Sequence, residues 1–155
     1  MKLKEHMTFG RSLSIISRHG QMYLDRELKS LRVRSGQIPI LRLLGVKDGI
    51  SQERIGNFFR LDKGTIAKTI RPLINEGYIT REKNPQDRRA YQVFLTQKGR
   101  NIIPDLKNAV ITWTNILTAD FTEEEKEMAH NLLSRMSDNA HEYLKNQSSE
   151  KDERG

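Results

Sequence analysis

The first part of the chain carries apolar residues at the spacing of an α-helix. The stripe consists of Phe9, Leu13, Ile16, Gly20, Leu24, Leu28 and Leu31. Residues three or four positions apart lie on one face of a helix, and polar residues fill the opposite face of this segment. The pattern therefore predicts one long amphipathic helix over residues 9–31.

Three shorter helical segments follow, and each starts at a residue whose side chain can cap a helix. Ser35 is expected to cap the first, with Pro39 tolerated near the first turn and a stop at Asp48-Gly49. Ser51 is expected to cap the second. Only a short turn then separates the second segment from the third.

The third short helix is the most regular of the three. Asp62 can cap its start, and Gly77 marks its C-terminal stop. Its apolar stripe consists of Ile66, Ile70, Leu73 and Ile74. This spacing predicts a helix that buries one face and leaves the other open.

After Gly77 the period of the pattern changes from helical to alternating. Alternation over residues 78–82, and again over 91–95, predicts two strands. The stretch 83–89 between them is rich in turn formers and cations and contains no apolar residue. We therefore expect a β-hairpin with an exposed cationic tip.

Two further helices are expected after the hairpin. Thr96 can cap the first, which Pro104 should bend because proline lacks the amide donor. Thr122 and Glu125 form a T-x-x-E capping box at the start of the second. The residues that the second is predicted to bury are Ala129, Leu132, Leu133, Met136, Ala140, Tyr143 and Leu144.

Length and composition fit one folded domain. The chain of 155 residues is too short for two enzyme domains, and it is 35% hydrophobic and 30% charged. The lack of cysteine excludes disulfides, cysteine-ligated zinc, iron–sulfur clusters and thiol-based redox sensing. No apolar run reaches the roughly 18 residues that span a bilayer, and residues 1–20 lack the order of a signal peptide. We expect a soluble, α-rich, cytoplasmic protein.

The net charge of +7 is distributed unevenly along the chain. Residues 60–100 hold 10 Lys and Arg against 4 Asp and Glu, whereas residues 120–155 hold 5 against 10. A basic surface gathers near a polyanion because each neutralised phosphate releases counterions. Nucleic-acid contacts are therefore expected in the middle of the chain, with an ordinary solvated basic surface as the alternative.

The order of the elements predicts how this basic region acts. Two short helices joined by a tight turn, followed by a hairpin with a cationic tip, suit a winged helix-turn-helix. In that fold the second helix enters the major groove of DNA and the wing reaches the neighbouring minor groove. The outward face of this helix carries Gly64, Thr65, Lys68, Arg71 and Asn75. Lys68 and Arg71 can reach guanine acceptors or phosphates, or they are solvated surface cations.

Three motifs resemble those of a known family. They are Gly77-Tyr78-Ile79 with Arg81, the tip Pro85-Gln86-Asp87-Arg88-Arg89, and Leu95-Thr96-Gln97-Lys98-Gly99. Together they resemble the wing signature of the MarR family, the multiple-antibiotic-resistance-type transcriptional regulators. The resemblance covers residues 35–100 and implies a homodimer that binds a pseudo-palindromic operator. It also implies a repressor that is released by a small, often aromatic or phenolic, effector.

The fold class expected from these patterns is mainly α with a small β-hairpin wing. It is a winged helix-turn-helix with long flanking dimerisation helices, whose position and length agree with those of the family. Within one domain, we expect a dimerisation helix over 1–34, a DNA-binding lobe over 35–100 and further dimerisation helices over 101–146. The polar residues 147–155 are expected to form a disordered tail.

The candidate DNA contacts lie on the two middle helices and the wing. They are Ser51, Gln52, Lys63, Gly64, Thr65, Lys68, Thr69, Arg71, Asp87, Arg88 and Arg89. By position, Arg89 resembles the wing arginine that enters the minor groove, and Asp87 resembles the carboxylate that braces it. Asp87 can instead form a turn by bonding its own backbone. Pro72 departs from the family pattern, and we expect it to bend the helix before Asn75.

Weaker signals concern a ligand. Arg18 and His19 are candidate anchors for a carboxylate or phenolate effector. Trp113 and Tyr143 can line an effector pocket or pack in a dimer core. The four histidines, His6, His19, His130 and His141, are read as surface or interface residues, so neither a metal nor a cofactor is expected.

Other classes of function also fit parts of this pattern. An architectural DNA-binding protein without an effector is one alternative, and a winged helix that binds an acidic protein partner is another. An enzyme is not expected, because no glycine-rich phosphate loop, paired-carboxylate site or nucleophile motif stands out. The predicted partners are double-stranded DNA, a second copy of the chain and a small effector, with no membrane.

Overall fold

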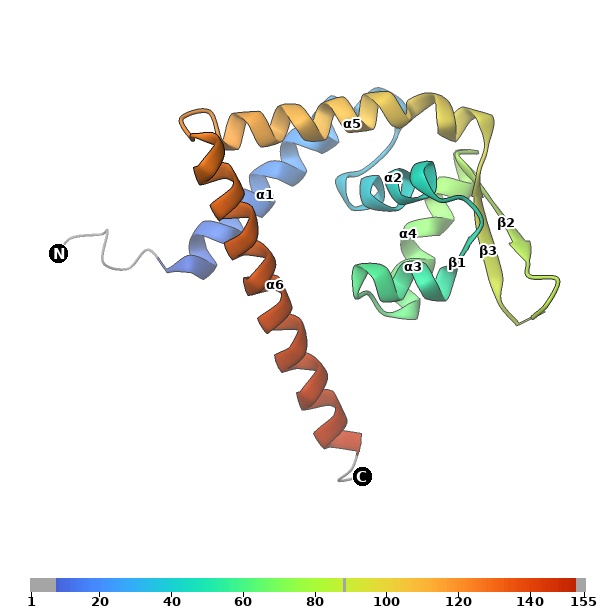
Figure 1. Cartoon of the computed structure of the whole chain (residues 1–155). Helices are drawn as coiled ribbons and strands as arrows, with labels where there is room; N and C mark the ends of the chain where they lie inside the picture. Colours follow the sequence, from blue (N-terminus) through green and yellow to red (C-terminus); the bar gives the residue numbers. More distant parts are fainter. Residues whose placement is uncertain (1–7, 88, 153–155) are drawn as a thin grey trace. The chain divides into compact units, whose positions relative to one another are not determined.

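The computed structural model describes residues 8–87 and 89–152 of the chain (Figure 1). It divides into two compact units, the first ending at Thr114 and the second beginning at Asn115. The elements are α1 (Phe9–Glu27), η2 (Lys29–Leu31), η3 (Ser35–Gln37), α2 (Ile38–Val46), β1 (Ile50–Ser51), α3 (Gln52–Phe59), α4 (Lys63–Asn75), β2 (Ile79–Lys83), β3 (Tyr91–Leu95), α5 (Gln97–Leu117) and α6 (Glu123–Asp152), where η marks a 3-10 helix. The predicted fold class, mainly helical with a small β wing, is confirmed.

The first helix is shorter than the apolar stripe predicts. Thr8 caps it, with the Thr8 hydroxyl oxygen accepting the amide of Arg11 at 3.4 Å, and α1 ends at Glu27 rather than at Leu31. The chain then tightens into η2 and turns at Arg32, which adopts a left-handed conformation with φ of 53°. A left-handed residue cannot continue an α-helix. Leu28 keeps the helical spacing but is buried in the turn that follows α1.

The start and the end of α2 also differ from the expectation. Ser35 does not cap α2, because residues 35–37 form η3 and the Gln37 side-chain oxygen accepts the amide of Arg34 at 2.9 Å. The Ser35 amide is held instead by the Asp25 carboxylate at 2.6 Å. Beyond the end of α2 at Val46, Asp48 accepts the amide of Leu95 at 2.8 Å. Asp48 therefore links the loop after α2 to the end of β3.

The helix-turn-helix is built from α3 and α4, and its predicted caps are confirmed. Ser51 accepts the amide of Arg54 at 3.2 Å, and Asp62 accepts the amide of Thr65 at 2.9 Å. Between the helices Arg60 turns the chain with φ of 55°. A Cβ on Gly56 would lie only 3.0 Å from the Leu61 carbonyl oxygen, so the turn packs tightly. The helix α4 continues through Pro72 to Asn75.

The small sheet has one strand more than the sequence pattern predicts. Its order is β1-β3-β2, and both pairings are antiparallel. The two residues of β1 pair with the middle of β3, with Ile50 opposite Val93. The predicted hairpin is formed by β2 and β3, with Ile79 opposite Leu95. The two-stranded wing is therefore anchored to the segment that leads directly into α3.

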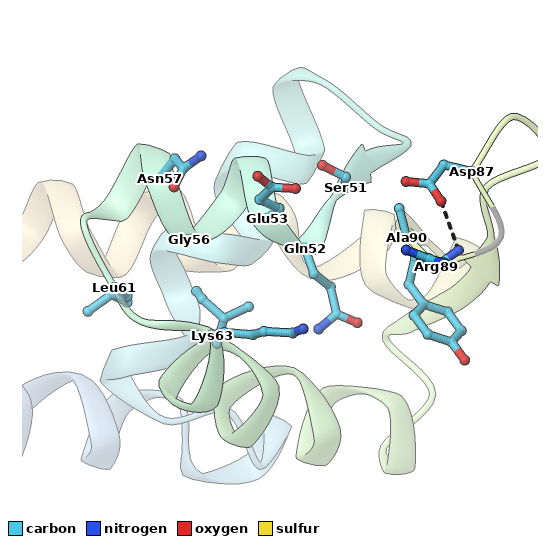
Figure 2. A pocket seen from close by; sticks show the side chains of 12 residues that line it. Ser51, Gln52, Glu53, Gly56, Asn57, Leu61, Lys63, Asp87, Arg89 and Ala90 are labelled. Carbon is cyan, nitrogen blue, oxygen red and sulfur yellow. Dashed lines mark hydrogen bonds between the residues drawn. The ribbon is translucent and has the colours of Figure 1, made fainter.

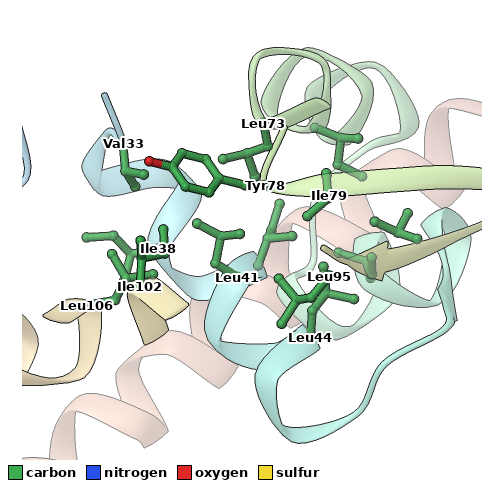
Figure 3. Close-up of a cluster of buried hydrophobic side chains, with 14 of the residues drawn as sticks. Val33, Ile38, Leu41, Leu44, Leu73, Tyr78, Ile79, Leu95, Ile102 and Leu106 are labelled. Atoms are coloured by element: carbon green, nitrogen blue, oxygen red, sulfur yellow. The ribbon is translucent and has the colours of Figure 1, made fainter. Parts of the chain in front are cut away.

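The core of the first unit lies between the short helices, the sheet and α5 (Figure 3). Its largest fully buried side chains are Ile40, Leu41, Leu44, Ile55, Ile66, Ile70, Leu73, Ile79, Val93 and Leu106. Ile102 and Leu106 of α5 join the same cluster as Val33 near the start of the lobe. Tyr78 is also buried, and its hydroxyl donates to the Leu31 carbonyl at 2.7 Å. Burial raises the pKa of Tyr78, and nearby Glu76 raises it further.

Two glycines allow close approaches at α5. The Thr96 hydroxyl caps this helix by accepting the amide of Gly99 at 3.0 Å, as predicted. A Cβ on Gly99 would lie 2.2 Å from the Tyr78 carbonyl oxygen, so only glycine fits there. Farther along, a Cβ on Gly20 of α1 would lie 2.9 Å from the indole nitrogen of Trp113, where α1 meets α5.

The second unit contains α6, whose predicted capping box is confirmed. The Glu125 carboxylate accepts the amide of Thr122 at 2.8 Å, and the Thr122 hydroxyl accepts the amide of Glu125 at 3.2 Å. The helix continues to Asp152, beyond residue 146 where the sequence pattern places its end. No side chain of α6 is buried among those the structure describes, so the predicted burial of its apolar stripe is not met within the single chain. Within residues 8–87 and 89–152, no helix has the length and apolar content needed to cross a bilayer.

Candidate nucleic-acid interface

The helix α4 separates its residues into a buried and an exposed face. Ile66, Ile70 and Leu73 are each 1% exposed and hold the helix against the core. Lys68 and Arg71 are exposed on the other side. The predicted face of α4 is therefore open to a partner, and its cations carry no acidic neighbour on the same helix.

The N-terminus of α4 is fixed by hydrogen bonds among its own polar residues. The Asp62 carboxylate accepts both the amide of Thr65 and its hydroxyl, the latter at 2.5 Å. The Thr69 hydroxyl donates to the Thr65 carbonyl at 2.8 Å. The bonds from Thr65, those of its side chain first, hold the pKa of Asp62 below its usual 3.8. Both threonine hydroxyl donors are thus engaged within the helix, which leaves Lys68 and Arg71 as the cationic donors of this face.

A hollow of about 430 Å³ lies between the wing and the starts of α3 and α4 (Figure 2). Its lining brings together five predicted site residues from three segments of the chain, namely Ser51, Gln52, Lys63, Asp87 and Arg89. Gly64, Thr65, Lys68, Thr69 and Arg71 do not line it and lie farther along α4. The predicted site therefore consists of a hollow beside the wing and an adjoining helix face.

The turn at the wing tip is formed by Asp87. One oxygen of its carboxylate accepts the amide of Arg89 at 3.0 Å, and its carbonyl accepts the amide of Ala90 at 2.9 Å. The bond between the Asp87 carboxylate and the Arg89 amide agrees with the interpretation of Asp87 as a turn-forming residue. The bracing of the Arg89 guanidinium by Asp87 stays a prediction, and Arg88 lies outside the described residues.

Two residues of the interface were not singled out by the sequence pattern as DNA contacts. The Arg81 guanidinium lies over the ring of Tyr91, 4.1 Å from its centroid. The same group donates to the side-chain oxygen of Gln52 at 3.3 Å. Arg81 and Gln52 are 29 positions apart, so no local spacing signals the contact. A predicted strand register could have placed Arg81 and Tyr91 on one face of the hairpin. It could not have shown that this face lies beside α3.

The candidate effector residues do not line the hollow beside the wing. Arg18 and His19 are exposed on α1. A second hollow, of about 390 Å³, is lined by Tyr23, Glu27, Leu28, Ser30, Leu31, Asp105, Asn108, Ala109 and Thr112, so Arg18 and His19 do not border it. Trp113 stacks on Tyr23 with ring centroids 5.3 Å apart, and Tyr143 is 65% exposed on α6. Trp113 thus has a packing role where α1 meets α5.

Known proteins resemble this chain in sequence and in structure. The model of the MarR family matches residues 33–91. The HTH-type transcriptional regulator BilQ of Clostridioides difficile is 30% identical over 118 residues, which cover 76% of this chain and 80% of BilQ. A MarR transcriptional regulator from Methanosarcina mazei Go1 is 36% identical with a TM-score of 0.78, over 86% of this chain and 96% of that protein.

A third protein is similar in fold at lower identity. This MarR family transcriptional regulator from Listeria monocytogenes, solved in complex with a 26mer DNA, has a TM-score of 0.81 at 24% identity. The alignment covers 89% of this chain and 94% of that protein. The matched family and its members are transcriptional regulators and not enzymes.

Proposed function

The chain belongs to the MarR family of transcriptional regulators, and on that premise we propose that it is a homodimeric repressor of a pseudo-palindromic operator. A small effector, of aromatic or phenolic type, releases it from DNA. Each α4 enters a major groove, and each wing follows the neighbouring minor groove. The two α4 helices then lie about 34 Å apart, one turn of DNA, so that the symmetry of the protein matches that of the operator.

The two-sided character of α4 is the observation that carries the proposal. Its apolar face is fully used by the core, while Lys68 and Arg71 project from the other face without an acidic neighbour on the helix. Lys63 and Arg89 add cations where the wing approaches the helix. A cationic helix face next to a cationic wing suits a groove lined by phosphates. The Listeria regulator, which shares this fold, was solved with duplex DNA, and this supports the same mode of docking here.

The apolar surface of the flanking helices supports the homodimer. On α1, Leu13 is 39% and Ile16 is 43% exposed. On α6, Leu132 is 44% and Leu133 is 50% exposed. Apolar side chains repeated along one helix face are rarely left in water by a protein that stays monomeric. We assign both faces to contacts with a second copy of the chain.

The hollow beside α1 and α5 supports effector control. It adjoins Leu31, whose carbonyl accepts the Tyr78 hydroxyl, and Tyr78 stands at the start of the wing. A ligand in this region can release DNA only if it binds better to a dimer whose α4 spacing does not fit the operator. Arg18 and His19 remain the proposed anchors if the effector is an anion that contacts α1.

Selection of duplexes from a random library tests the proposal directly. We expect the purified protein to enrich an inverted repeat whose half-sites are centred about one helical turn apart. Affinity for every sequence alike would favour an architectural DNA-binding protein. No affinity for duplex DNA at low salt would overturn the proposal and favour an acidic protein partner. Titrating small aromatic acids and phenols against the bound duplex then tests release by an effector.

Two alanine variants test the assignment of the cations. Lys68→Ala and Arg89→Ala should each weaken binding to the selected duplex and reduce the salt slope of the affinity by about 1, because each removes one phosphate contact. Arg42→Ala, which removes an exposed cation from α2, is the matched control and should leave the slope unchanged. Unchanged affinity in both test variants would contradict the residue assignments.

A further inference from the structure

Arg81 occupies the point where the buried face of the sheet ends. The register places Ile79 opposite Leu95, Arg81 opposite Val93 and Lys83 opposite Tyr91, so all of these side chains leave the hairpin on one face. Ile79, Leu95 and Val93 are buried on that face, whereas Arg81 is exposed. Arg81 is therefore the first side chain of β2 beyond the core on the side that faces the helices.

The Arg81 guanidinium joins three elements at this edge. It stacks on Tyr91 of β3, 4.1 Å from the ring centroid, and it donates to the Gln52 side-chain oxygen at 3.3 Å. Gln52 is the first residue of α3 and lines the hollow beside the wing. A planar guanidinium can stack its face on the ring while it donates along its edge, a fixed geometry that the tetrahedral ammonium of lysine does not reproduce. The contact ties both strands of the wing to the start of α3.

This contact determines which way the Gln52 carboxamide is oriented. A guanidinium has only donors, so the Gln52 oxygen must face Arg81. The Gln52 amide nitrogen then keeps both of its N–H donors for another partner. Phosphate oxygens only accept hydrogen bonds, so a fixed pair of N–H donors is what a DNA backbone can use.

We propose that Arg81 is a positioning residue, which stacks on Tyr91 and holds the Gln52 side chain with its amide donors presented to the DNA backbone while it fixes the wing against α3. The proposal rests on the DNA binding proposed above and adds to it a residue that acts through another. A direct phosphate contact by Arg81 itself is the competing role.

A double-mutant cycle separates positioning from a direct contact. The probe is the fluorescein-labelled duplex recovered in the selection, and the variants are Arg81→Met, Gln52→Ala and their combination. If Arg81 acts through Gln52, each single variant lowers affinity by about 10-fold, and the double variant loses little more than either. If Arg81 binds phosphate independently, the losses multiply to about 100-fold, and this outcome overturns the proposal.

The salt dependence of binding provides a second, independent readout. Loss of a phosphate contact made by Lys or Arg lowers the slope of log affinity against log salt by about 1 in DNA binding. Gln52 is neutral, so a positioning role predicts that the slope stays nearly unchanged in both Arg81→Met and Gln52→Ala, although both lose affinity. Arg42→Met removes an equal charge from α2 and serves as the control for net charge. A slope that falls in Arg81→Met but not in Gln52→Ala contradicts positioning.

Variants of Tyr91 and Arg81 separate the effect of the stacking geometry from the effect of the charge. Tyr91→Leu removes the stacking surface without changing the charge and should reproduce most of the loss seen in Arg81→Met. Tyr91→Phe keeps the ring and should stay much closer to the wild type than Tyr91→Leu. Arg81→Lys keeps the charge without the planar group and should behave like Arg81→Met. Wild-type affinity in Arg81→Lys would show that charge alone suffices and would overturn the proposal.

A measurement without DNA distinguishes failure of this inference from failure of the proposed function. The side-chain amide signals of Gln52 in an NMR spectrum should shift in Arg81→Met, while the thermal midpoint of unfolding shows that the variant is folded. Unchanged Gln52 signals overturn the positioning role, whether or not the wild type binds DNA. If the Gln52 signals shift but the wild-type protein does not bind duplex DNA, the contact between Arg81 and Gln52 is supported and the proposed function is rejected.

Discussion

The lobe that contains α2, α3, α4 and the sheet differs from the flanking helix α1 in how it uses its apolar residues. In the lobe, Leu41, Ile55 and Val93 are 0% exposed. Along α1, Leu13 and Ile16 are 39% and 43% exposed, and the single buried residue within that helix is a glycine. The same periodic pattern of apolar residues is thus buried in the lobe but exposed at Leu13 and Ile16 of α1.

The difference teaches that periodicity predicts an apolar face but not what covers it. The lobe supplies its own cover, because helices and strands from both ends of its sequence meet in one core. Along α6 and the N-terminal half of α1 the stripe is as regular as in the lobe, yet the single chain leaves it open. We therefore expect substitutions in the lobe to act on stability and substitutions in the flanks to act on association.

The largest effect is expected from Leu41→Ala in the core of the lobe. Removing a fully buried leucine side chain leaves a cavity and should lower the free energy of unfolding by about 2–5 kcal/mol. Urea unfolding at a fixed protein concentration measures it. Val46→Ala on the same helix is the control, because Val46 is 89% exposed and its loss should change stability by no more than about 0.5 kcal/mol. Equal losses of unfolding free energy in Leu41→Ala and Val46→Ala would contradict the difference between buried and exposed apolar residues.

A charge on α6 should act on association instead. Leu132→Glu places a carboxylate in the proposed dimer interface and should weaken dimerisation by about 100-fold, or about 2.7 kcal/mol. Sedimentation equilibrium measures this, and the unfolding of the lobe should change little. Ser134→Glu adds the same charge to another face of α6 and should leave the dimer intact. A wild-type protein that is monomeric at every concentration would contradict the assignment of this face.

A smaller effect is expected where α1 and α5 meet. Gly20→Val places side-chain atoms where the Trp113 indole lies, and the overpacking should cost about 1–3 kcal/mol of unfolding free energy. Tryptophan fluorescence should change with it, because Trp113 is the single tryptophan of the chain. Gly10→Val, near the start of the same helix, serves as the control, because a Cβ there would meet nothing closer than the Thr8 hydroxyl oxygen at 4.0 Å. An unaltered Trp113 emission in Gly20→Val would contradict the close approach.

The smallest effect concerns the cap of α4 and depends on pH. The folded-state pKa of Asp62 lies below 3.8, so its cap stabilises the fold above that pH and the contribution is lost as pH falls through the folded value. Asp62→Asn should therefore be less stable than the wild type at pH 7, and the difference should shrink below pH 3.8. Thermal midpoints across this range measure it. A difference that stays constant down to pH 2 would contradict the role of the charge.

The sequence predicted those parts of the fold that depend on neighbouring residues. The caps at Ser51, Asp62 and Thr96 are each made by a side chain that bonds an amide three residues later. The box of Thr122 and Glu125 has the same local character. Such bonds join positions only three residues apart, so a sequence pattern can predict them where no distant residue intervenes, as Asp25 does at Ser35.

The parts that the sequence could not predict depend on partners far along the chain. The strand β1 has two residues and exists because Ile50 meets Val93, so no alternating pattern announces it. The Ser35 amide is taken by Asp25, ten residues earlier, and α2 starts later than expected. In the candidate site, the cations of α4 were predicted from their spacing. The contact of Arg81 with Gln52 was not, because it depends on how the wing packs against α3.

The position of α5 in the core has a consequence for how such proteins can be recombined. Along the sequence, Leu28 and Val33 precede the DNA-binding elements, and Ile102 and Leu106 follow them. All four residues belong to one hydrophobic cluster. A graft that transfers only residues 35–100 into another scaffold would cut through this cluster and expose it to water. Swapping the specificity of this regulator therefore requires a segment from about Leu28 to Ala109, so that the DNA-binding elements are transferred together with the flanking residues that complete their core.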